Sequence, residues 1–272
     1  MGGKNKGKGR AKAPGVKARP RRAAAVRRSE QRDLKACLQE CREELETAQK
    51  DLESFCFSVS HDLRAPLRSI DGFGNALLHE FGEKLEPQAQ EYLRRIVDSS
   101  KKMSLLIDEL LVISRIQRTE LVPEEINLTD LAESIIARLR KNEPQRKVLF
   151  SAEPGLRARA DRTLAGTLLE KLLENAWKFT GRSSGPKIEF FAKTRNSQRV
   201  FVVRDNGVGF DMAYAGKLFK AFQRLHSPSE YSGLGSGLAI ARAIVVRHRG
   251  RIWTESSEGR GAIFCFTLGK GP

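Results

Sequence analysis

The chain has few cysteines and no long apolar segment, and both absences narrow the classes of protein to which it can belong. Its 272 residues include four cysteines, none in a Cys-x-x-Cys pair: Cys37, Cys41, Cys56 and Cys265. This argues against a disulfide framework or a zinc site and fits a reducing, cytoplasmic location. No apolar run approaches the roughly 18 residues of a transmembrane segment, so none is expected. The N-terminus also lacks the apolar core of a secretory signal.

Acidic residues are absent from the first 28 positions, which hold eleven Lys and Arg residues. Because the formal net charge of the whole chain is +16, this segment carries most of it and the rest is only mildly basic. Its composition of Gly, Ala, Pro, Lys and Arg predicts a disordered tail over residues 1–29. The tail either makes a weak contact with nucleic acid or another anionic surface through residues 1–28, or is simply solvated.

A heptad pattern follows the tail. Apolar residues recur at alternating intervals of four and three positions: Leu34, Leu38, Cys41, Leu45, Ala48, Leu52, Phe55 and Val59. Such a seam is typical of a parallel coiled coil, which needs a second helix to cover it. The pattern therefore predicts a coiled-coil signalling helix over residues 30–58 and a homodimer.

A histidine that is followed directly by a carboxylate lies just past this seam, at His61 and Asp62. His61 falls two residues beyond the last seam position, so its imidazole should point outwards. An imidazole nitrogen is a nucleophile near neutral pH, and a neighbouring carboxylate can hold its tautomer and accept its proton. His61 is therefore a candidate nucleophile and Asp62 its candidate catalytic partner.

Residues 59–118 predict a helical hairpin. Helical spacing of apolar residues continues to Phe81, Gly82 can close that helix, and Pro87 can open a second one. Each helix has one apolar face, and two hairpins can bury these faces in a dimeric four-helix bundle. Residues 59–118 are thus expected to form a dimerisation domain.

The rest of the chain predicts a second domain of mixed structure. Pro123 and the acidic pair Glu124 and Glu125 interrupt the helical pattern, so residues 119–126 are interpreted as a linker. Residues 127–272 combine helical patterns at 128–139, 164–179 and 238–247 with strand patterns at 147–151, 157–160, 187–193, 200–204, 251–255 and 262–268. This order predicts an α+β chain whose second domain is an α/β sandwich, with helices on one face of a mostly antiparallel sheet.

Four motifs in order resemble those of the sensor histidine kinases of two-component signalling. Residues 61–67 (HDLRAPL) resemble the H-box, 172–180 (LLENAWKFT) the N-box, and 205–209 (DNGVG) and 233–237 (GLGSG) the two glycine-rich boxes. The H-box is of the phytochrome and PAS-kinase type, and the resemblance covers residues 44–268. It implies the GHKL-type ATP-binding fold for residues 127–272.

The resemblance also implies roles for single residues. It makes His61 the phosphoacceptor, Asn175 the Mg²⁺ ligand and Asp205 the residue that binds adenine. The nucleotide site that it implies also includes Lys178, Gly207, Gly209, Phe219, Phe222, Arg224, Gly233, Gly235, Gly237 and Leu238. Phe219, Phe222 and Arg224 belong to the stretch that resembles a mobile lid. Glycine amides before a helix can bind phosphate, which fits the positions of Gly233, Gly235 and Gly237.

By the same resemblance, the protein uses ATP and Mg²⁺ to phosphorylate His61 and passes the phosphoryl group to an Asp of a separate response-regulator receiver domain. The sequence shows neither a sensor domain nor a receiver domain, so the input is expected from an unidentified partner.

Three positions depart from the family pattern. Lys171 stands where the family often has a second Asn, Ser236 where it usually has Ile, and Ala65 where members with strong phosphatase activity have Thr or Asn. Ala65 therefore predicts weak phosphatase activity. Lys171 leaves open a degenerate kinase that binds ATP and acts as a scaffold or dimer partner. A regulator that associates with nucleic acid through its basic tail is the other alternative.

Overall fold

The computed structural model describes residues 2–3, 19–118, 120–195, 198–223, 230–231 and 235–269. The chain divides into two compact units, Met1–Phe55 and Cys56–Pro272, and each is described by itself. In the described residues, no helix combines the length and the apolar character that crossing a membrane requires.

The first unit is helical from Arg19, where helix α1 (Arg19–Phe81) begins. The sequence predicts disorder up to residue 29, and this is wrong for residues 19–29. Pro20 lies in the first turn, where its missing N–H costs nothing, and several of the Ala and Arg residues that follow are good helix formers. Most of the predicted tail, residues 1 and 4–18, lies outside the described residues.

The apolar seam of the first unit is exposed in the single chain. Leu34, Leu38, Leu45 and Phe55 all have well over half of their surface accessible. A seam of this kind is stable when a second helix covers it. The coiled coil over residues 30–58 therefore stays a prediction that requires a second chain.

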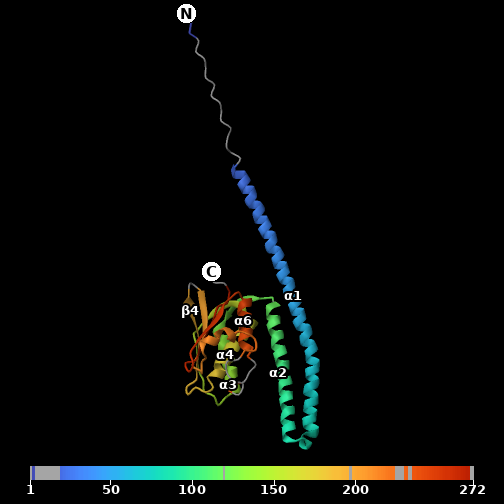
Figure 1. Ribbon diagram of the computed structural model, residues 1–272. Helices are drawn as coiled ribbons and strands as arrows, with labels where there is room; N and C mark the ends of the chain where they lie inside the picture. The colour runs from blue at the N-terminus through green and yellow to red at the C-terminus, as the bar shows by residue number, and fades with distance from the viewer. Residues whose placement is uncertain are drawn as a thin grey trace. The chain divides into compact units, whose positions relative to one another are not determined.

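The second unit begins with the predicted helical hairpin (Figure 1). Helix α1 continues through Pro66 to Phe81, the short 3₁₀ helix η1 (Gly82–Lys84) follows, and α2 (Pro87–Arg118) runs back along α1. The hydroxyl of Ser100 donates a buried hydrogen bond of 2.9 Å to the carbonyl of Leu67. Arg64 pairs with Asp108 at 2.7 Å. These contacts fix the register of the two helices.

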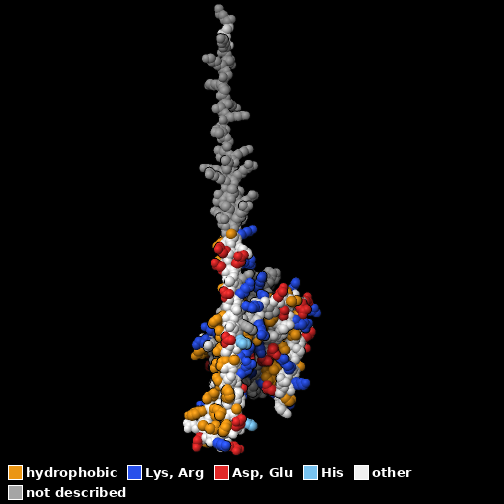
Figure 2. Space-filling model, turned by 90° about the vertical axis from the view of Figure 1, so that its right-hand side faces the viewer, with side chains coloured by type: hydrophobic (Ala, Val, Ile, Leu, Met, Phe, Trp, Pro, Cys, Tyr) orange, Lys and Arg blue, Asp and Glu red, His pale blue; other side chains and the backbone are white. Residues whose placement is uncertain are grey.

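Hydrophobic side chains cover part of the hairpin surface. Figure 2 shows them gathered over its lower part. The exposed ones include Ile70, Phe73, Leu77, Tyr92, Ile96 and Met103. A groove of about 620 Å³ lies among several of them, lined by Leu67, Ile70, Tyr92, Ile96 and Met103. An apolar surface of this extent on a helical hairpin is typical of an interface.

The rest of the second unit is a mixed α/β domain. Its strands are β1 (Pro123–Asn127), β2 (Leu149–Ala152), β3 (Arg157–Asp161), β4 (Lys187–Arg195), β5 (Gln198–Asp205), β6 (Ile252–Ser256) and β7 (Ala262–Phe266). Its helices are α3 (Leu128–Asn142), α4 (Arg162–Phe179), η2 (Met212–Tyr214), α5 (Ala215–Leu218) and α6 (Gly237–Arg247). The predicted α+β class is confirmed.

The main sheet has the strand order β2-β4-β5-β7-β6. Strands β2 and β4 are parallel, and the other pairs are antiparallel. Helices α3, α4 and α6 pack together beside the sheet (Figure 1). Four leucines of α4 at helical spacing are fully buried: Leu168, Leu169, Leu172 and Leu173. The rings of Phe190, Phe201 and Phe266 pack in series across the three central strands. This core fixes α4 over the sheet.

Part of the predicted linker is a strand. Residues 123–127 form β1, which pairs antiparallel with β3 in a separate two-stranded sheet, and Ile126 is fully buried there. Pro123 is tolerated because it is the first residue of the strand. Glu124 pairs with Arg162 and Glu125 with Arg157 across the sheet. The acidic pair that suggested a break thus makes ion pairs that local sequence does not reveal.

The burial of Ile126 gives a test of this strand. We expect Ile126→Ala to lower the free energy of unfolding by about 2–5 kcal/mol, because it leaves a cavity in the core. Val122→Ala is the matched control, since Val122 is 71% exposed. Thermal and urea unfolding of both variants would measure the difference. Equal stabilities would show that residues 122–126 are a linker after all.

Candidate nucleotide and phosphoacceptor sites

The carboxylate of Asp205 lies buried at the end of β5, with 4% of its surface exposed. Its Oδ1 accepts hydrogen bonds from the backbone N–H of Gly207 at 2.8 Å and of Ala262 at 3.4 Å. Burial raises the pKa of Asp205 to about 6, and the two hydrogen bonds oppose this rise. A partly desolvated carboxylate of this kind is a strong acceptor for an amino group such as that of adenine.

Two glycines let the backbone close around Asp205. Gly209 has a φ of +64°, and a Cβ there would lie 2.2 Å from the carbonyl oxygen of Ser257. Gly261 has a φ of +85°, and its Cβ would lie 2.0 Å from the carbonyl oxygen of Asp205. Only glycine fits such positions. Sequence reasoning did not place Gly261 in the site, because it lies 56 residues after Asp205 and reads as an ordinary hairpin turn.

Helix α4 carries the predicted N-box. Asp161 caps its first turn by accepting a hydrogen bond of 3.0 Å from the N–H of Leu164. At its other end, the carbonyl of Phe179 accepts from the N–H of Val208 at 3.3 Å. The helix is therefore joined directly to the loop that follows Asp205. Asn175 and Lys178 are half-buried near this joined end.

Asn175 has the chemistry to hold a metal ion. Within the described residues, no group of three or more His, Cys, Asp or Glu side chains could bind one. Mg²⁺ needs no such group, because it binds one or two protein oxygens and takes its other ligands from phosphate and water. The half-buried amide of Asn175 fits that requirement.

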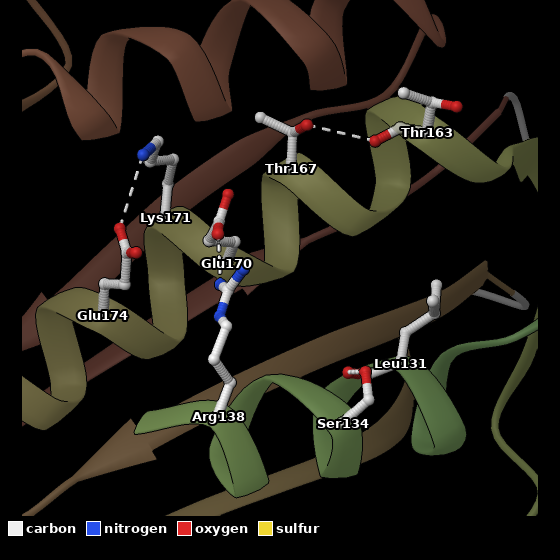
Figure 3. A network of polar contacts seen from close by, with 8 residues as sticks. All are labelled: Leu131, Ser134, Arg138, Thr163, Thr167, Glu170, Lys171 and Glu174. Atoms are coloured by element: carbon white, nitrogen blue, oxygen red, sulfur yellow. Dashed lines mark hydrogen bonds and ion pairs between the residues drawn. The ribbon is translucent and has the colours of Figure 1, made fainter. Parts of the chain in front are cut away.

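Charged side chains precede and follow Asn175 on α4, and Figure 3 shows those that precede it, Glu170, Lys171 and Glu174. Lys171 lies one turn before it and pairs with Glu174, with 3.3 Å between Nζ and Oε2. Glu170 pairs instead with Arg138 of α3. Lys178, one turn after Asn175, lies with Nζ 4.4 Å from the centre of the Phe179 ring.

The lid region is described in part. Phe219 packs against the hydrophobic core, whereas Phe222 is exposed and has a φ of +65°. The predicted residues Arg224 and Gly233 lie outside the described residues. Tyr231 is buried, and its ring lies 5.0 Å from that of Phe179. Sequence reasoning missed this contact, because nothing local to Tyr231 indicates that it reaches the end of α4.

The predicted anion site lies at the start of α6. Gly235 has a φ of +82°, α6 begins at Gly237, and Leu238 is buried in its first turn. The first amides of a helix lack partners within the helix and attract anions. Gly237 lies beside Lys171 of α4, because a Cβ on Gly237 would be 3.6 Å from Lys171 Cδ. The start of α6 therefore adjoins the N-box face.

His61 has the exposure that was predicted. Its side chain is 73% exposed and that of Asp62 is 75% exposed, with 3.3 Å between His61 Nδ1 and Asp62 Oδ1. The structure thus brings Asp205, Gly207, Gly209, Asn175 and Gly237 around α4. His61 and Asp62 lie apart on α1, and no hydrogen bond or ion pair between described residues joins them to that group.

The raised pKa of Asp205 predicts a pH dependence for nucleotide binding. ADP affinity should fall as the pH drops below about 6, because the protonated carboxyl accepts a hydrogen bond less well. The stability of the free protein has the opposite dependence on pH. The protonated carboxyl stabilises the fold below the ordinary pKa of 3.8, and this stabilisation is lost as the pH rises through about 6.

Calorimetric titration with ADP between pH 5 and pH 8, at ~0.5-unit intervals, would measure the binding term. Asp205→Asn is the control, since it cannot ionise and leaves only the titration of the ADP phosphates. A wild-type profile parallel to that of Asp205→Asn would contradict the assignment.

The close approach of Gly261 predicts a second difference. Gly259→Ala should cost about 1–2 kcal/mol of stability for the positive φ, and Gly261→Ala should cost more, because its Cβ also overlaps the carbonyl oxygen of Asp205. Only Gly261→Ala should also abolish ADP binding, because its Cβ must displace the backbone of Asp205, whereas Gly259 faces open space. Unfolding curves and ADP titration of both variants would check this. Equal ADP affinities would remove Gly261 from the site.

Two protein families match the chain, one over each region that holds a candidate site. The family of the His Kinase A (phospho-acceptor) domain matches residues 51–119. The family of the histidine kinase-, DNA gyrase B- and HSP90-like ATPases matches residues 160–272. The first match contains His61 and Asp62, and the second contains Asn175, Asp205 and α6.

Several curated proteins are similar to the chain over most of its length. It is 34% identical over 230 residues to cyanobacterial phytochrome B of Nostoc, covering 83% of this chain and 30% of that protein. It is 36% identical over 232 residues to the methanogenesis regulatory histidine kinase FilI of Methanothrix harundinacea, covering 85% and 26%. The chain therefore spans less than a third of the length of these relatives.

A solved structure shares the fold. The crystal structure of full-length ShkA in complex with AMPPNP matches with a TM-score of 0.54 and 21% identity, over 80% of this chain and 46% of that one. The chain therefore contains a His Kinase A (phospho-acceptor) domain followed by a histidine kinase-, DNA gyrase B- and HSP90-like ATPase domain.

Proposed function

We propose that the protein is an ATP-dependent histidine kinase that phosphorylates its own His61. The observation that carries this proposal is the exposed His61–Asp62 pair, in one chain with a buried Asp205 beside a glycine-lined loop. The first arrangement suits a nucleophile, and the second suits recognition of a nucleotide base. The relatives named as histidine kinases support the same interpretation.

The base is recognised by Asp205. Its carboxylate accepts the amino proton of adenine, while Gly207 and Gly209 let the loop backbone approach the ring. Phe219 and Phe222 belong to the lid over this site. ShkA, which shares the fold, was crystallised in complex with AMPPNP, and this supports an adenine nucleotide as the ligand.

The phosphates extend from this base along α4. Lys178 and the amides at Gly235, Gly237 and Leu238 bind their oxygens, together with Arg224 and Gly233 of the lid region. Asn175 holds Mg²⁺, which when bound neutralises phosphate charge and orients the terminal group. The role of these residues is therefore to position the γ-phosphoryl group rather than to form a covalent bond with it.

The transfer step uses the geometry of His61. With its proton on Nδ1 and directed at Asp62, the lone pair of Nε2 faces solvent. Nε2 attacks the γ-phosphorus, a P–N bond forms, and the bond to the bridging oxygen breaks as ADP leaves. Asp62 stabilises the positive charge that develops on the imidazole or accepts its proton.

The phosphoryl group then passes to an Asp of a separate response-regulator receiver domain in the cytoplasm. A homodimer forms through the seam of residues 30–58 and the exposed face of the hairpin at 59–118. The coiled coil relays a signal from an unidentified input partner. Because Ala65 cannot orient a water molecule, removal of the phosphoryl group by the kinase itself is weak.

A degenerate kinase is the second candidate. It would bind ATP and act as a scaffold or dimer partner without phosphorylating His61. The specific observation that favours it is Lys171, which occupies a phosphate-side position of the N-box and is tied to Glu174. The two candidates differ in one product, a phosphohistidine.

Labelling with γ-labelled ATP and Mg²⁺ separates them. We expect wild-type protein to acquire a label that is labile in acid and stable in alkali. His61→Gln should abolish the label because it removes the nucleophile, and Asn175→Asp should reduce it by at least about tenfold through the lost metal geometry.

His79→Gln is the matched control, since His79 is an exposed histidine of the same helix and should retain full labelling. If wild-type protein binds ATP and stays unlabelled, the autokinase proposal fails and the scaffold takes its place. Label that persists in His61→Gln would show that another residue is modified.

A further inference from the structure

The C-terminal half of α4 marks the two ends of the nucleotide. At its C-terminal end, Phe179 is hydrogen-bonded to the loop after Asp205, where the base is proposed to bind. At the middle of α4, Lys171 lies against Gly237 at the start of α6. At 1.5 Å per residue, Lys171 and Phe179 are about 12 Å apart along the axis. A nucleotide whose base lies at the Phe179 end therefore directs its phosphates toward Lys171.

Lys171 shares a helix face with the other phosphate-side residues. It precedes Asn175 by four positions and Lys178 by seven, and residues at these intervals follow one another along one side of a helix. The order along this face, from the base outwards, is Lys178, Asn175 and Lys171. Lys171 is thus the cation nearest the far end of the phosphate chain, beyond the proposed metal position.

The present partner of Lys171 is weakly held. Its Nζ lies 3.3 Å from Glu174 Oε2, and the two side chains are 28% and 40% exposed (Figure 3). A partly exposed pair one turn apart on a helix contributes little to stability. The Glu174 carboxylate lies where another anion could contact the Lys171 ammonium group. A terminal phosphate carries more negative charge than a carboxylate. Exchange of one partner for the other is therefore favourable.

We propose that Lys171 binds the terminal phosphate of ATP and that Glu174 competes for it in the nucleotide-free protein. This inference rests on the proposed ATP site. It makes Lys171 a residue that favours triphosphate over diphosphate nucleotides. An Asn at this position could donate a hydrogen bond to phosphate, whereas lysine also supplies a full positive charge. The departure from the family pattern then strengthens ATP binding and does not mark a degenerate site.

Calorimetric titration with AMPPNP and with ADP, each with Mg²⁺, tests the inference. We expect Lys171→Gln to weaken AMPPNP binding about tenfold and ADP binding less than about twofold, because one charge-assisted contact to the terminal phosphate is lost. Lys171→Arg should restore most of the preference. Lys141→Gln removes an exposed lysine of α3 and should leave both affinities unchanged.

Glu174→Gln supplies a result of opposite sign. It should tighten AMPPNP binding about two- to fivefold, since Lys171 is released from its competitor. In Lys171→Gln/Glu174→Gln this gain should vanish, because the effect of Glu174 passes through Lys171. A residue with only a structural role in α4 would not produce this reversal.

Two failures are distinguishable. Absence of ADP and AMPPNP binding in the wild type would overturn the proposed nucleotide site itself. Normal binding of both, with an unchanged AMPPNP-to-ADP affinity ratio in Lys171→Gln, would overturn the role of Lys171 alone.

Discussion

The desolvated carboxylate of Asp205 is the constraint on which the nucleotide domain depends. Its burial raises its pKa, and the N–H groups of Gly207 and Ala262 are what keep a charged form accessible there. Those two donors come from segments far apart in the chain, so they meet only if β5 and β7 pair in register. The glycines at 209 and 261 follow from the same requirement, because a side chain at either would push the backbone away.

Helix α4 connects the hydrophobic core to the candidate site. Its leucine face is fully buried against the sheet, and a neighbouring, half-buried face carries Lys171, Asn175 and Lys178 at helical intervals. Because the buried face fixes the rotation of the helix, this half-buried face has no freedom to present a different set of side chains. The Asp161 cap and the Phe179 carbonyl fix its two ends. The positions of the proposed phosphate ligands are thus a consequence of hydrophobic packing.

Local patterns were enough to predict most of the helices and the strands of the main sheet. The turn of the hairpin was predictable because Gly82 and Pro87 act through their own backbone conformations. These effects can be inferred from the identity of the residue alone. Strand β1, the approach of Gly261 to Asp205 and the contact of Tyr231 with Phe179 depend on pairing between distant segments. The start of α1 at Arg19 was missed for another reason: a charged composition suggested disorder, while the intrinsic helix propensity of Ala and Arg favours a helix.

The two sites differ in solvent exposure, and this difference indicates which of them can select the phosphoryl donor. The carboxylate proposed to recognise the base, Asp205, is buried, and desolvation strengthens its polar contacts. His61 is largely exposed, so its hydrogen bond to Asp62 is weakened by water and cannot by itself select a phosphoryl donor. If His61 is phosphorylated as proposed, selection of the phosphoryl donor must therefore come from the nucleotide domain. The proposed contact of Lys171 with the terminal phosphate would serve this selection, because it would favour a triphosphate over a diphosphate before the domain meets His61.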